Sequence, residues 1–400
     1  MKILHVVPTY VPAWRHGGPI VAVHGLCRAL VARGHQVTVY TTNLHGDGTL
    51  PVPVREPMRV EGVEVRYFPV SPPRRLYRSP AMGQALRAAI GNFDVAHLHS
   101  LYLWPTFAAA RAAERAAVPY LVAPRGMLVR DLVERRGRLR KRLWIRLVER
   151  RSIERAAGLH VTSDLEASEA AAFGLRLPRV VVVPTGVDAE PLRLRDFSAV
   201  AASLREVVEA SAFFLYLGRL SWKKNLDRLV AALPLVPEAE LVLAGPDDEG
   251  LWPALARQAA AAGVADRLRW VGPVAGEDKA ALFHTATALV LPSSSENFGN
   301  AALEAMAVGC PVVVGPAVGL APVVAEAGAG IVAPPEPEAL AAAFRLLLAD
   351  PERRSRMRRA GPEAARRFAW PEVGRAMEEV YEQALAGARA GERRQRIGGA

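Results

Sequence analysis

Residues 2–42 read KILHVVPTYVPAWRHGGPIVAVHGLCRALVARGHQVTVYTT, and this stretch decides the fold class. A short apolar run, KILHVVP, is followed by a helical pattern from Pro19 to Arg33 and by a second run, QVTVYTT. Pro19 suits the first turn of a helix, and Gly34 suits the position just past its end. Strand, helix and strand in this order predict a right-handed unit with two parallel strands.

The same alternation continues through two parts of the chain, separated by a pause between Asp188 and Ser211. It predicts an α/β protein with two doubly wound parallel sheets, each a Rossmann-like domain. The further strand-like runs are VEVRYFPV, DVAHLHS, YLVAP, GLHVTS and RVVVVP in the first part, and FFLYLGRL, AELVLAGPD, RLRWVGPV, ATALVLPSS, PVVVGPA and AGIVAPP in the second.

We therefore expect domains over residues 1–188 and 213–370, joined by a linker region at 189–212. A helical pattern at 371–388 predicts a last helix, and residues 389–400 predict a flexible tail. Ligands of doubly wound sheets bind at the carboxyl ends of the strands, so we expect the two sheet edges to face a central cleft.

Composition supports a globular enzyme in a reducing compartment. Hydrophobic residues make up 51% and charged residues 23% of 400 residues, which excludes a disordered or fibrous chain. The two cysteines, Cys27 and Cys310, are too few for a disulfide framework, so we expect a cytoplasmic protein. The opening MKILHVVPTY lacks a signal-peptide core, and Pro and Gly interrupt the apolar stretch 311–335, so we expect no membrane span.

Positive charge is concentrated in one part of the chain. The net charge is +11, and residues 125–155 hold twelve basic residues and four acidic ones. Leucines and valines recur there at helical spacing, which predicts an amphipathic helix over Arg130–Arg155. Two interpretations stay open, a solvated helix face and contact with an anionic membrane surface. Nucleic acid is disfavoured, because no aromatic stacking platform accompanies the charge.

The strongest chemical motif is SSSENFGNAALEAMAVGCPVVV, in which Glu296 and Glu304 are separated by seven residues. Gly299 permits a tight turn, and Asn297 or Asn300 can cap a helix that ends at Gly309. The free amides and positive dipole end of that helix would face a phosphate at the carboxyl edge. Two carboxylates beside a phosphate can accept hydrogen bonds from sugar hydroxyls, which indicates a sugar nucleotide.

Two further loops are expected at carboxyl edges. In LGRLSWKKNLDRLV, a strand ends at Gly218, so Arg219 and Lys224 lie on the following loop, where they can neutralise a diphosphate. Gly17 and Gly18 precede the first helix of the N-terminal domain and form a candidate phosphate-facing or substrate-facing loop. A plain tight turn is the other interpretation of this glycine pair.

The run FDVAHLHSLY places His97 and His99 on one face of a strand, because side chains alternate along it. His99 lies nearer the carboxyl edge and is the better functional candidate, whereas His97 is more typical of a core residue. A metal site is disfavoured because no Asp or Cys ligand set accompanies them. The sequence also has no Gly-Lys-Ser/Thr phosphate loop, which disfavours nucleotide hydrolysis.

Taken together, ENFGNAALEAMAVGCPVVV, GRLSWKKN, VVVPTGVD, the GGP loop and DVAHLHS resemble the retaining glycosyltransferases of family 4, which have the two-domain GT-B fold. The resemblance covers residues 1 to about 375. It departs at Asn225, where the family usually has Gly, and at AVGLAPVV, where Gly-Gly-x-Pro-Glu is common. It implies an acceptor-side N-terminal domain, a nucleotide-sugar-binding C-terminal domain, and a last helix that crosses back to the N-terminal domain.

The resemblance also implies roles for individual residues. Glu296 is expected at the donor sugar hydroxyls and Glu304 at the ribose, within a donor-binding block that includes Asn297, Phe298, Gly299 and Asn300. Arg219 and Lys224 are expected at the diphosphate, and Gly17 and Gly18 at the donor phosphates. His99 is expected near the donor sugar and the acceptor.

The expected activity is metal-independent transfer of a hexosyl unit, with retention, from a UDP-, GDP- or ADP-sugar to an acceptor hydroxyl. The acceptor is expected to be a glycan or a lipid-linked sugar, as in the synthesis of cell-surface polysaccharide or glycolipid. Two alternatives are a nucleotide-sugar epimerase with the same fold and a non-catalytic binding subunit. The second would lack some of the paired groups, and all of them are present.

Overall fold

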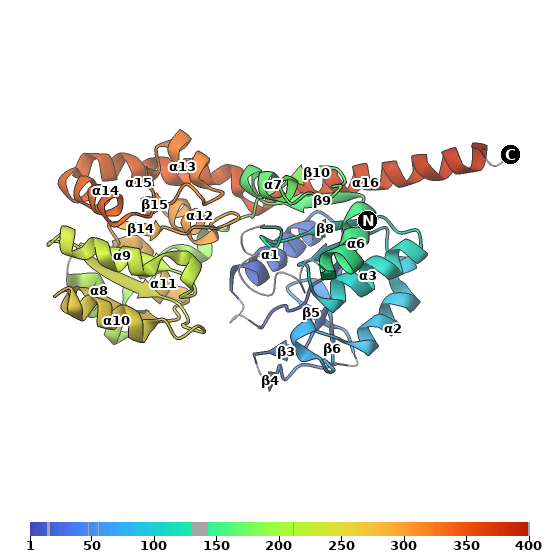
Figure 1. Cartoon of the computed structure of the whole chain (residues 1–400), viewed down its shortest axis with the longest axis horizontal. Coiled ribbons are helices and arrows are strands. Elements are labelled where there is room, and N and C mark those ends of the chain that lie inside the picture. Colours follow the sequence, from blue (N-terminus) through green and yellow to red (C-terminus); the bar gives the residue numbers. More distant parts are fainter. Residues whose placement is uncertain (14–16, 47, 55, 130–142, 211, 399–400) are drawn as a thin grey trace. The chain divides into compact units, whose positions relative to one another are not determined.

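The protein is described by a computed structural model that covers residues 1–13, 17–46, 48–54, 56–129, 143–210 and 212–398. It forms two compact units (Figure 1). Unit 1 is made of Met1–Gly186 and Trp370–Ala400, and unit 2 is Val187–Ala369. The chain therefore leaves unit 1 after Gly186 and returns to it at Trp370.

Unit 1 is built on a sheet with the strand order β10-β9-β8-β7-β1-β2-β6-β5 in the described residues. All neighbouring strands are parallel except β5 and β6, and β3 and β4 form a separate small hairpin. The strands are β1 (Lys2–Val6), β2 (Gln36–Thr42), β3 (Leu44–His45), β4 (Gly48–Thr49), β5 (Met58–Val60), β6 (Val63–Phe68), β7 (Val95–His99), β8 (Tyr120–Ala123), β9 (Gly158–Val161) and β10 (Val180–Val182).

Alternation along the strands of unit 1 produces two buried faces, each covered by helices. On β1, Ile3 packs with helices α1 and α16, whereas Leu4 packs with α2, α3, α6 and α7 on the opposite face. The helices are α1 (Gly18–Ala32), α2 (Pro80–Ala89), α3 (Trp104–Arg115), α6 (Arg150–Glu154), α7 (Asp164–Ala171) and α16 (Trp370–Gly398), with a π-helical segment η4 (Ile145–Glu149).

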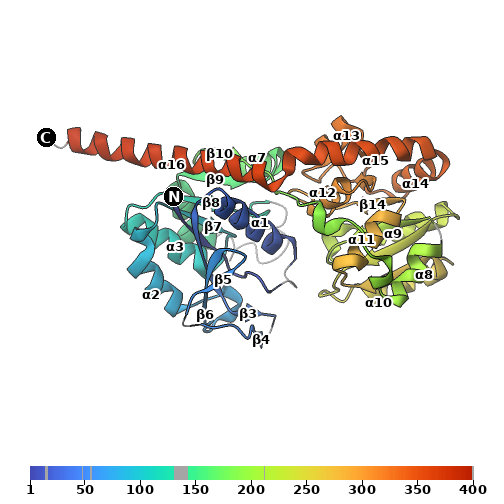
Figure 2. The ribbon, with the colours of Figure 1, turned by 180° about the vertical axis from the view of Figure 1, so that it is seen from behind.

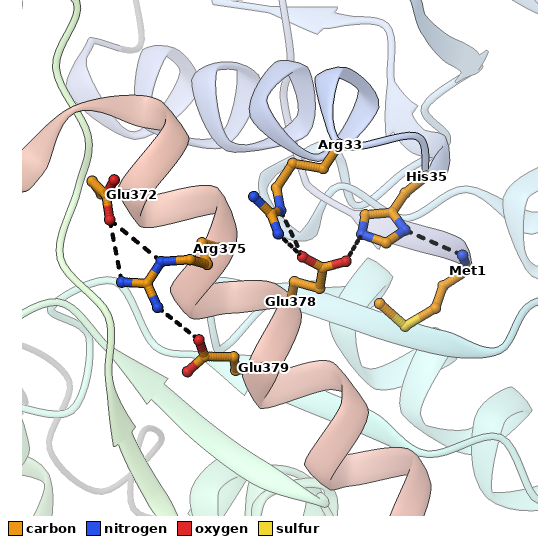
Figure 3. A network of polar contacts seen from close by, with 7 residues as sticks. All are labelled: Met1, Arg33, His35, Glu372, Arg375, Glu378 and Glu379. Carbon is orange, nitrogen blue, oxygen red and sulfur yellow. Dashed lines mark hydrogen bonds and ion pairs between the residues drawn. The ribbon is translucent and has the colours of Figure 1, made fainter.

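Helix α16 is the last element of unit 1 and packs along α1 (Figures 1 and 2). Glu378 of α16 accepts a hydrogen bond from Arg33 Nε at 2.6 Å, and its other carboxylate oxygen lies 2.9 Å from His35 Nε2 (Figure 3). The Arg33 guanidinium lowers the pKa of the Glu378 carboxyl. Trp370, at the start of α16, leaves no room for a side chain at Gly25, since a Cβ there would lie 2.1 Å from the indole ring.

Unit 2 is built on a parallel sheet with the strand order β13-β12-β11-β14-β15-β16 in the described residues. Its strands are β11 (Phe213–Leu217), β12 (Glu240–Ala244), β13 (Leu268–Gly272), β14 (Ala288–Leu291), β15 (Val312–Val314) and β16 (Gly330–Val332). Its helices are α8 (Ala202–Ala210), α9 (Leu226–Ala232), α10 (Trp252–Ala261), α11 (Gly276–Thr285), α12 (Asn300–Ala307), α13 (Ala321–Ala327), α14 (Pro337–Ala349) and α15 (Pro351–Ala365).

The structure corrects two expected boundaries. The segment 189–212, expected to be a linker, belongs to unit 2 and contains α8, because Val200, Leu204 and Val207 form an apolar face buried in that unit's core. Helix α16 continues to Gly398, so the expected helix end at 388 and the flexible tail at 389–400 are replaced by helix as far as the described residues extend.

The expected basic helix Arg130–Arg155 is only partly described, because residues 130–142 lie outside the described residues. Its described part contains η4 and α6, in which Arg150 and Arg151 are exposed. Among the described helices, none combines the length and the apolar character that are needed to cross a membrane.

Candidate functional site

The basic loop of unit 2 begins where strands β11 and β12 end side by side. Gly218 and Gly245 follow these strands with φ values of 153° and 137°, in a region that residues with a side chain rarely adopt. A Cβ atom on Gly245 would lie 2.0 Å from the carbonyl oxygen of Gly218. Glycine thus allows the close approach of the two strand ends from which Arg219 starts the loop. The Arg219 side chain is exposed.

Lys224 and Glu296 come together as an ion pair, although they are distant in the sequence. Lys224 ends the short helical turn η7 (Trp222–Lys224), and Glu296 follows β14. Their side chains are 13% and 19% exposed, so the pair is largely shielded yet still reaches solvent. The structure therefore places a cation expected at the diphosphate directly beside a carboxylate expected at the donor sugar.

Asn225, one of the two departures from the family pattern, keeps the basic loop in place. It has a left-handed φ of 52°, a conformation that Asn adopts more readily than most residues with a side chain. Its side-chain amide donates to the carbonyl oxygen of Pro292 at 2.7 Å. Asn225 therefore supplies a backbone conformation that suits glycine and adds a tie to the loop after β14.

The segment 296–300 is held by backbone pairing with the other departure, AVGLAPVV. Glu296 and Val318 form an isolated parallel bridge, and Leu320 N donates to Phe298 O at 2.8 Å. Phe298 is buried. Gly299 has a φ of 104°, and a Cβ there would lie 2.8 Å from Val318 Cγ1. Val318 therefore fills the space beneath Gly299 and fixes the turn into α12.

Helix α12 starts at Asn300 and carries Glu304 one turn later. Glu304 forms a 2.8 Å ion pair with Lys279 of α11, and both side chains are 20% exposed. Asn297 and Asn300 are half-buried at the start of this helix. Each of the two predicted carboxylates thus has its own lysine partner, and Lys279 was not singled out from the sequence because nothing local connects it to Glu304.

The glycine pair of unit 1 caps helix α1. Gly17 has a φ of 76° and precedes Gly18, the first residue of the helix. A Cβ atom on Gly17 would meet nothing within 4 Å, so this position needs glycine for its backbone conformation rather than for space. The preceding loop residues 14–16 lie outside the described residues.

His99 and His97 are both buried, with 1% and 0% exposure, beneath α1 and α16. His99 Nε2 lies 3.0 Å from His5 Nδ1, and His97 Nδ1 lies 2.8 Å from the hydroxyl of Tyr381 on α16. The two histidines thus lie in one buried group, although from the sequence we expected a functional role for His99 and a core role for His97. Their partners on β1 and α16 were missed because they come from distant parts of the chain.

Burial makes these imidazoles resistant to protonation. His160 of β9 belongs to the same group, since its Nδ1 lies 3.2 Å from His97 Nε2. Desolvation, followed by the nearby positive charge of Arg125, lowers the pKa of His5 to about 3 and that of His160 to about 3. Desolvation also lowers the pKa values of His97 and His99 well below the usual value. The cluster is therefore neutral at physiological pH.

The nearest approach to a metal-ligand set in the described chain is His5, His97 and His99, whose ligand atoms lie within 4.8 Å of one another. The same nitrogens already have hydrogen-bond partners within the cluster. A metal ion there would have to replace those hydrogen bonds.

In unit 2, burial and the charge of Lys224 lower the pKa of Lys223, consistent with a basic loop that concentrates positive charge.

Comparison with known proteins shows the family of both units. The family described as glycosyl transferases group 1 matches residues 205–364, and the glycosyl transferase 4-like domain matches residues 17–186. A D-inositol 3-phosphate glycosyltransferase of Xylanimonas cellulosilytica is 32% identical, over 92% of this chain and 92% of its own.

Solved structures share the fold. Sucrose-phosphate synthase from Thermosynechococcus elongatus is 21% identical with a TM-score of 0.75, over 97% of this chain and 100% of that one. Anabaena HepE in complex with UDP and glucose is 20% identical with a TM-score of 0.76, over 96% and 99%. Two Rossmann-like parallel-sheet units therefore define a protein with the GT-B fold.

The chain belongs to the GT4-type glycosyltransferases. It is an enzyme that transfers a sugar from a nucleotide sugar.

The neutral histidine cluster predicts acid sensitivity of unit 1. His5 and His160 have pKa values of about 3 in the folded state, against about 6.5 for an unfolded chain. Below pH 6.5 the unfolded chain binds protons that the folded chain cannot, so stability falls progressively as the pH drops from 6.5 towards 3. Each histidine contributes up to about 1.4 kcal/mol per pH unit.

The measurement is the urea midpoint of unit 1 at pH 7.5, 6.0 and 5.0. Pulse proteolysis detects the unfolding of unit 1 through the peptides that are cleaved from residues 1–186. His160→Gln should flatten the pH dependence, whereas replacement of the exposed His284 by Gln in unit 2 should leave it unchanged. A midpoint for the unaltered protein that does not move between pH 7.5 and 5.0 would contradict the prediction.

Proposed function

We propose that the enzyme moves a hexosyl unit from a nucleoside diphosphate sugar to an acceptor hydroxyl with retention of configuration and without a metal ion. The observation that carries the proposal is the pairing of Glu296 with Lys224 and of Glu304 with Lys279 at the carboxyl edge of unit 2. In each pair, the carboxylate can accept hydrogen bonds from sugar hydroxyls. The lysine can either bind phosphate oxygens or hold the carboxylate in position.

Donor binding would exchange one of these ion pairs for contacts with the substrate. The diphosphate would take over Lys224, together with the exposed Arg219 and the amino end of α12. Glu296, released from Lys224, could then accept hydrogen bonds from the donor sugar. Lys279 holds Glu304 one helical turn away, where its carboxylate can accept from the ribose hydroxyls.

The departing diphosphate would be stabilised by the protein itself. Arg219, Lys224 and the α12 amides present fixed positive charge where negative charge develops on the leaving oxygen, which is an electrostatic form of catalysis. Retention follows if the acceptor attacks from the face that the diphosphate leaves and a diphosphate oxygen accepts the acceptor proton. From unit 1, we propose the Gly17–Gly18 loop at the donor phosphates and His99 near the sugar.

The acceptor is proposed to be a glycan or a lipid-linked sugar, in the synthesis of cell-surface polysaccharide or glycolipid in the cytoplasm. Proteins with the same fold have been solved with different nucleotides. HepE has been solved with UDP-glucose, and a starch synthase from Arabidopsis thaliana with ADP and acarbose. The donor panel therefore includes UDP- and ADP-sugars, and GDP-sugars complete it.

A donor panel with an acceptor mixture tests the function. A transferase releases nucleoside diphosphate only when an acceptor is present, whereas an epimerase converts the donor sugar without releasing it. A non-catalytic subunit would bind a donor, raising the melting temperature, with no change in the donor. Donor conversion without nucleotide release would overturn transfer in favour of epimerisation.

We further propose that residues 143–154 touch an anionic membrane surface. Leu143 and Leu147 are 58% and 66% exposed, which is unusual for leucines one helical turn apart. The exposed Arg150 and Arg151 follow them directly. Apolar side chains beside cations suit the boundary between lipid headgroups and acyl chains.

Glu296→Gln should greatly reduce turnover while nucleoside diphosphate binding survives, because the lost contacts lie at the sugar. Glu304→Gln should instead weaken nucleotide affinity. Removal of a charge-assisted hydrogen bond costs about 1.5–3 kcal/mol, or roughly ten- to more than a hundredfold. Steady-state kinetics and calorimetry separate the two effects. The exposed Glu326→Gln serves as the control, and full turnover in both site variants would refute the roles.

Arg219→Ala and Lys224→Ala should each slow transfer by several kcal/mol of barrier, on the order of a hundredfold or more, since the leaving diphosphate loses a cation. Added EDTA should leave the unaltered enzyme active. Arg228→Ala, which removes an exposed cation of α9 paired with Glu336, is the matched control. Loss of activity on chelation, with recovery on adding magnesium or manganese, would show that a metal is required.

Binding to vesicles with anionic lipid should exceed binding to neutral vesicles and should fade as salt is added. Leu143→Ser combined with Leu147→Ser should weaken it, because the exposed apolar anchor is lost. Leu346→Ser, at an exposed leucine of unit 2, should not. Equal co-sedimentation with neutral and anionic vesicles would leave the segment as a solvated face.

A further inference from the structure

Arg125 lies at the carboxyl edge of unit 1, two residues after β8, on a backbone with a left-handed φ of 54°. Its Nη2 atom lies 3.1 Å from His99 Nδ1. The residue as a whole is half-buried. From the sequence, Arg125 was recognised only as one of the twelve basic residues within residues 125–155.

A chain of hydrogen bonds begins at this guanidinium and has a fixed direction. Arginine can only donate, so His99 Nδ1 accepts and the proton of His99 is on Nε2. His99 Nε2–H then donates to His5 Nδ1 at 3.0 Å, which places the proton of His5 on Nε2. His5 Nε2 lies 3.5 Å from the hydroxyl oxygen of Tyr381, which is left as the acceptor.

The second half of the chain is fixed from its other end. The carbonyl oxygen of Val183 can only accept, so His160 Nε2–H donates to it at 2.9 Å and His160 Nδ1 is an acceptor. His97 Nε2–H donates to that nitrogen at 3.2 Å. The Tyr381 hydroxyl then donates to His97 Nδ1 at 2.8 Å. Both ends therefore give the same direction, and all four histidines carry their proton on Nε2.

This chain positions Arg125 without neutralising it. The four imidazoles are neutral, and desolvation lowers the pKa of the Arg125 guanidinium, an effect that the negative charge of Glu166 opposes. The Nε atom of Arg125 is buried without a hydrogen-bond partner. Among the described residues, no carboxylate lies within ion-pair distance of Arg125. Glu166, whose charge acts on Arg125 from beyond that distance, accepts hydrogen bonds from Gly126 N and from the amide and hydroxyl of Thr162.

We propose that Arg125 is a binding residue for phosphate-type oxygens of a substrate, and that the chain through Tyr381 holds its guanidinium ready for that anion. The inference rests on the proposed function for the source of the anion, which is the donor diphosphate or a phosphate on the acceptor. A shielded cation without a carboxylate partner is costly unless a bound anion compensates for it. His99 is then a positioning residue for Arg125, because both its ring nitrogens are engaged.

The first test detects the anion at Arg125 without turnover. Protein labelled with ¹⁵N-histidine is titrated with pyrophosphate and with UDP, in a background where Arg219→Ala and Lys224→Ala remove the unit 2 cations. We expect a saturable change in the His99 Nδ1 resonance, which is lost in Arg125→Gln. Arg115→Gln is the matched control, since this exposed arginine ends α3 at the opposite edge of the sheet.

The same spectra test the direction of the chain. We expect an unprotonated Nδ1 and a protonated Nε2 for His5, His97, His99 and His160, and protonated Nδ1 in these rings would overturn the assignment. Tyr381→Phe should leave the protein folded but weaken pyrophosphate binding about tenfold, because it removes the link that holds the two halves together. Unchanged pyrophosphate affinity in Arg125→Gln would refute the anion site, whether or not the enzyme transfers sugars.

Two arms distinguish the source of the anion. Weaker UDP binding in Arg125→Gln assigns the site to the donor diphosphate. Weaker binding of inorganic phosphate alone, with UDP binding unchanged, assigns it to a phosphate carried by the acceptor. Failure of the donor panel to show transfer would refute the proposed function but leave the binding results on Arg125 intact.

Discussion

Parallel pairing of strands is the constraint on which both units depend. Because neighbouring strands run in one direction, their carboxyl ends meet at one edge, and the loops that leave that edge lie side by side. In unit 2, this brings Lys224, after β11, against Glu296, after β14. In unit 1, it brings His99, at the end of β7, against Arg125, after β8. Residues separated by 72 and 26 positions become neighbours through one rule of sheet topology.

The same rule explains what could be predicted from the sequence. Strands are recognised from local sequence patterns. The strands β11 to β16 and the turn into α12 can each be recognised from a few consecutive residues. The motif residues from Glu296 to Glu304 were therefore found together, and Gly299 could be assigned to a turn. The segment 189–212 was expected to be a linker because its many charged residues obscure the helical spacing of Val200, Leu204 and Val207. Their packing in the core of unit 2 shows that they form the apolar face of a folded segment.

Residues whose role depends on a distant partner left no local signal. Tyr381 reaches His97 across 284 positions, and Lys279 reaches Glu304 from another helix. A tyrosine or lysine in an amphipathic helix is ordinary, so only the packing of α16 on α1, and the ion pair between α11 and α12, distinguish them. Strand patterns can predict which edge of a sheet holds the functional residues. They cannot predict which residue of a distant helix contacts those residues.

The two edges treat charge in different ways, and the difference follows from their partners. In unit 2, Glu296 and Glu304 are each paired with a lysine, so a substrate can exchange with an existing ion pair at little net cost in desolvation. In unit 1, the Arg125 side chain is hydrogen-bonded to the neutral ring of His99, and the charge of Glu166 acts on it without forming an ion pair among the described residues. A carboxylate in direct ion-pair contact with Arg125 would stabilise the cation more than Glu166 does from its greater distance, but it would compete with any anionic ligand. The histidine chain holds the arginine in place without that competition, which is why its neutrality matters as much as its geometry.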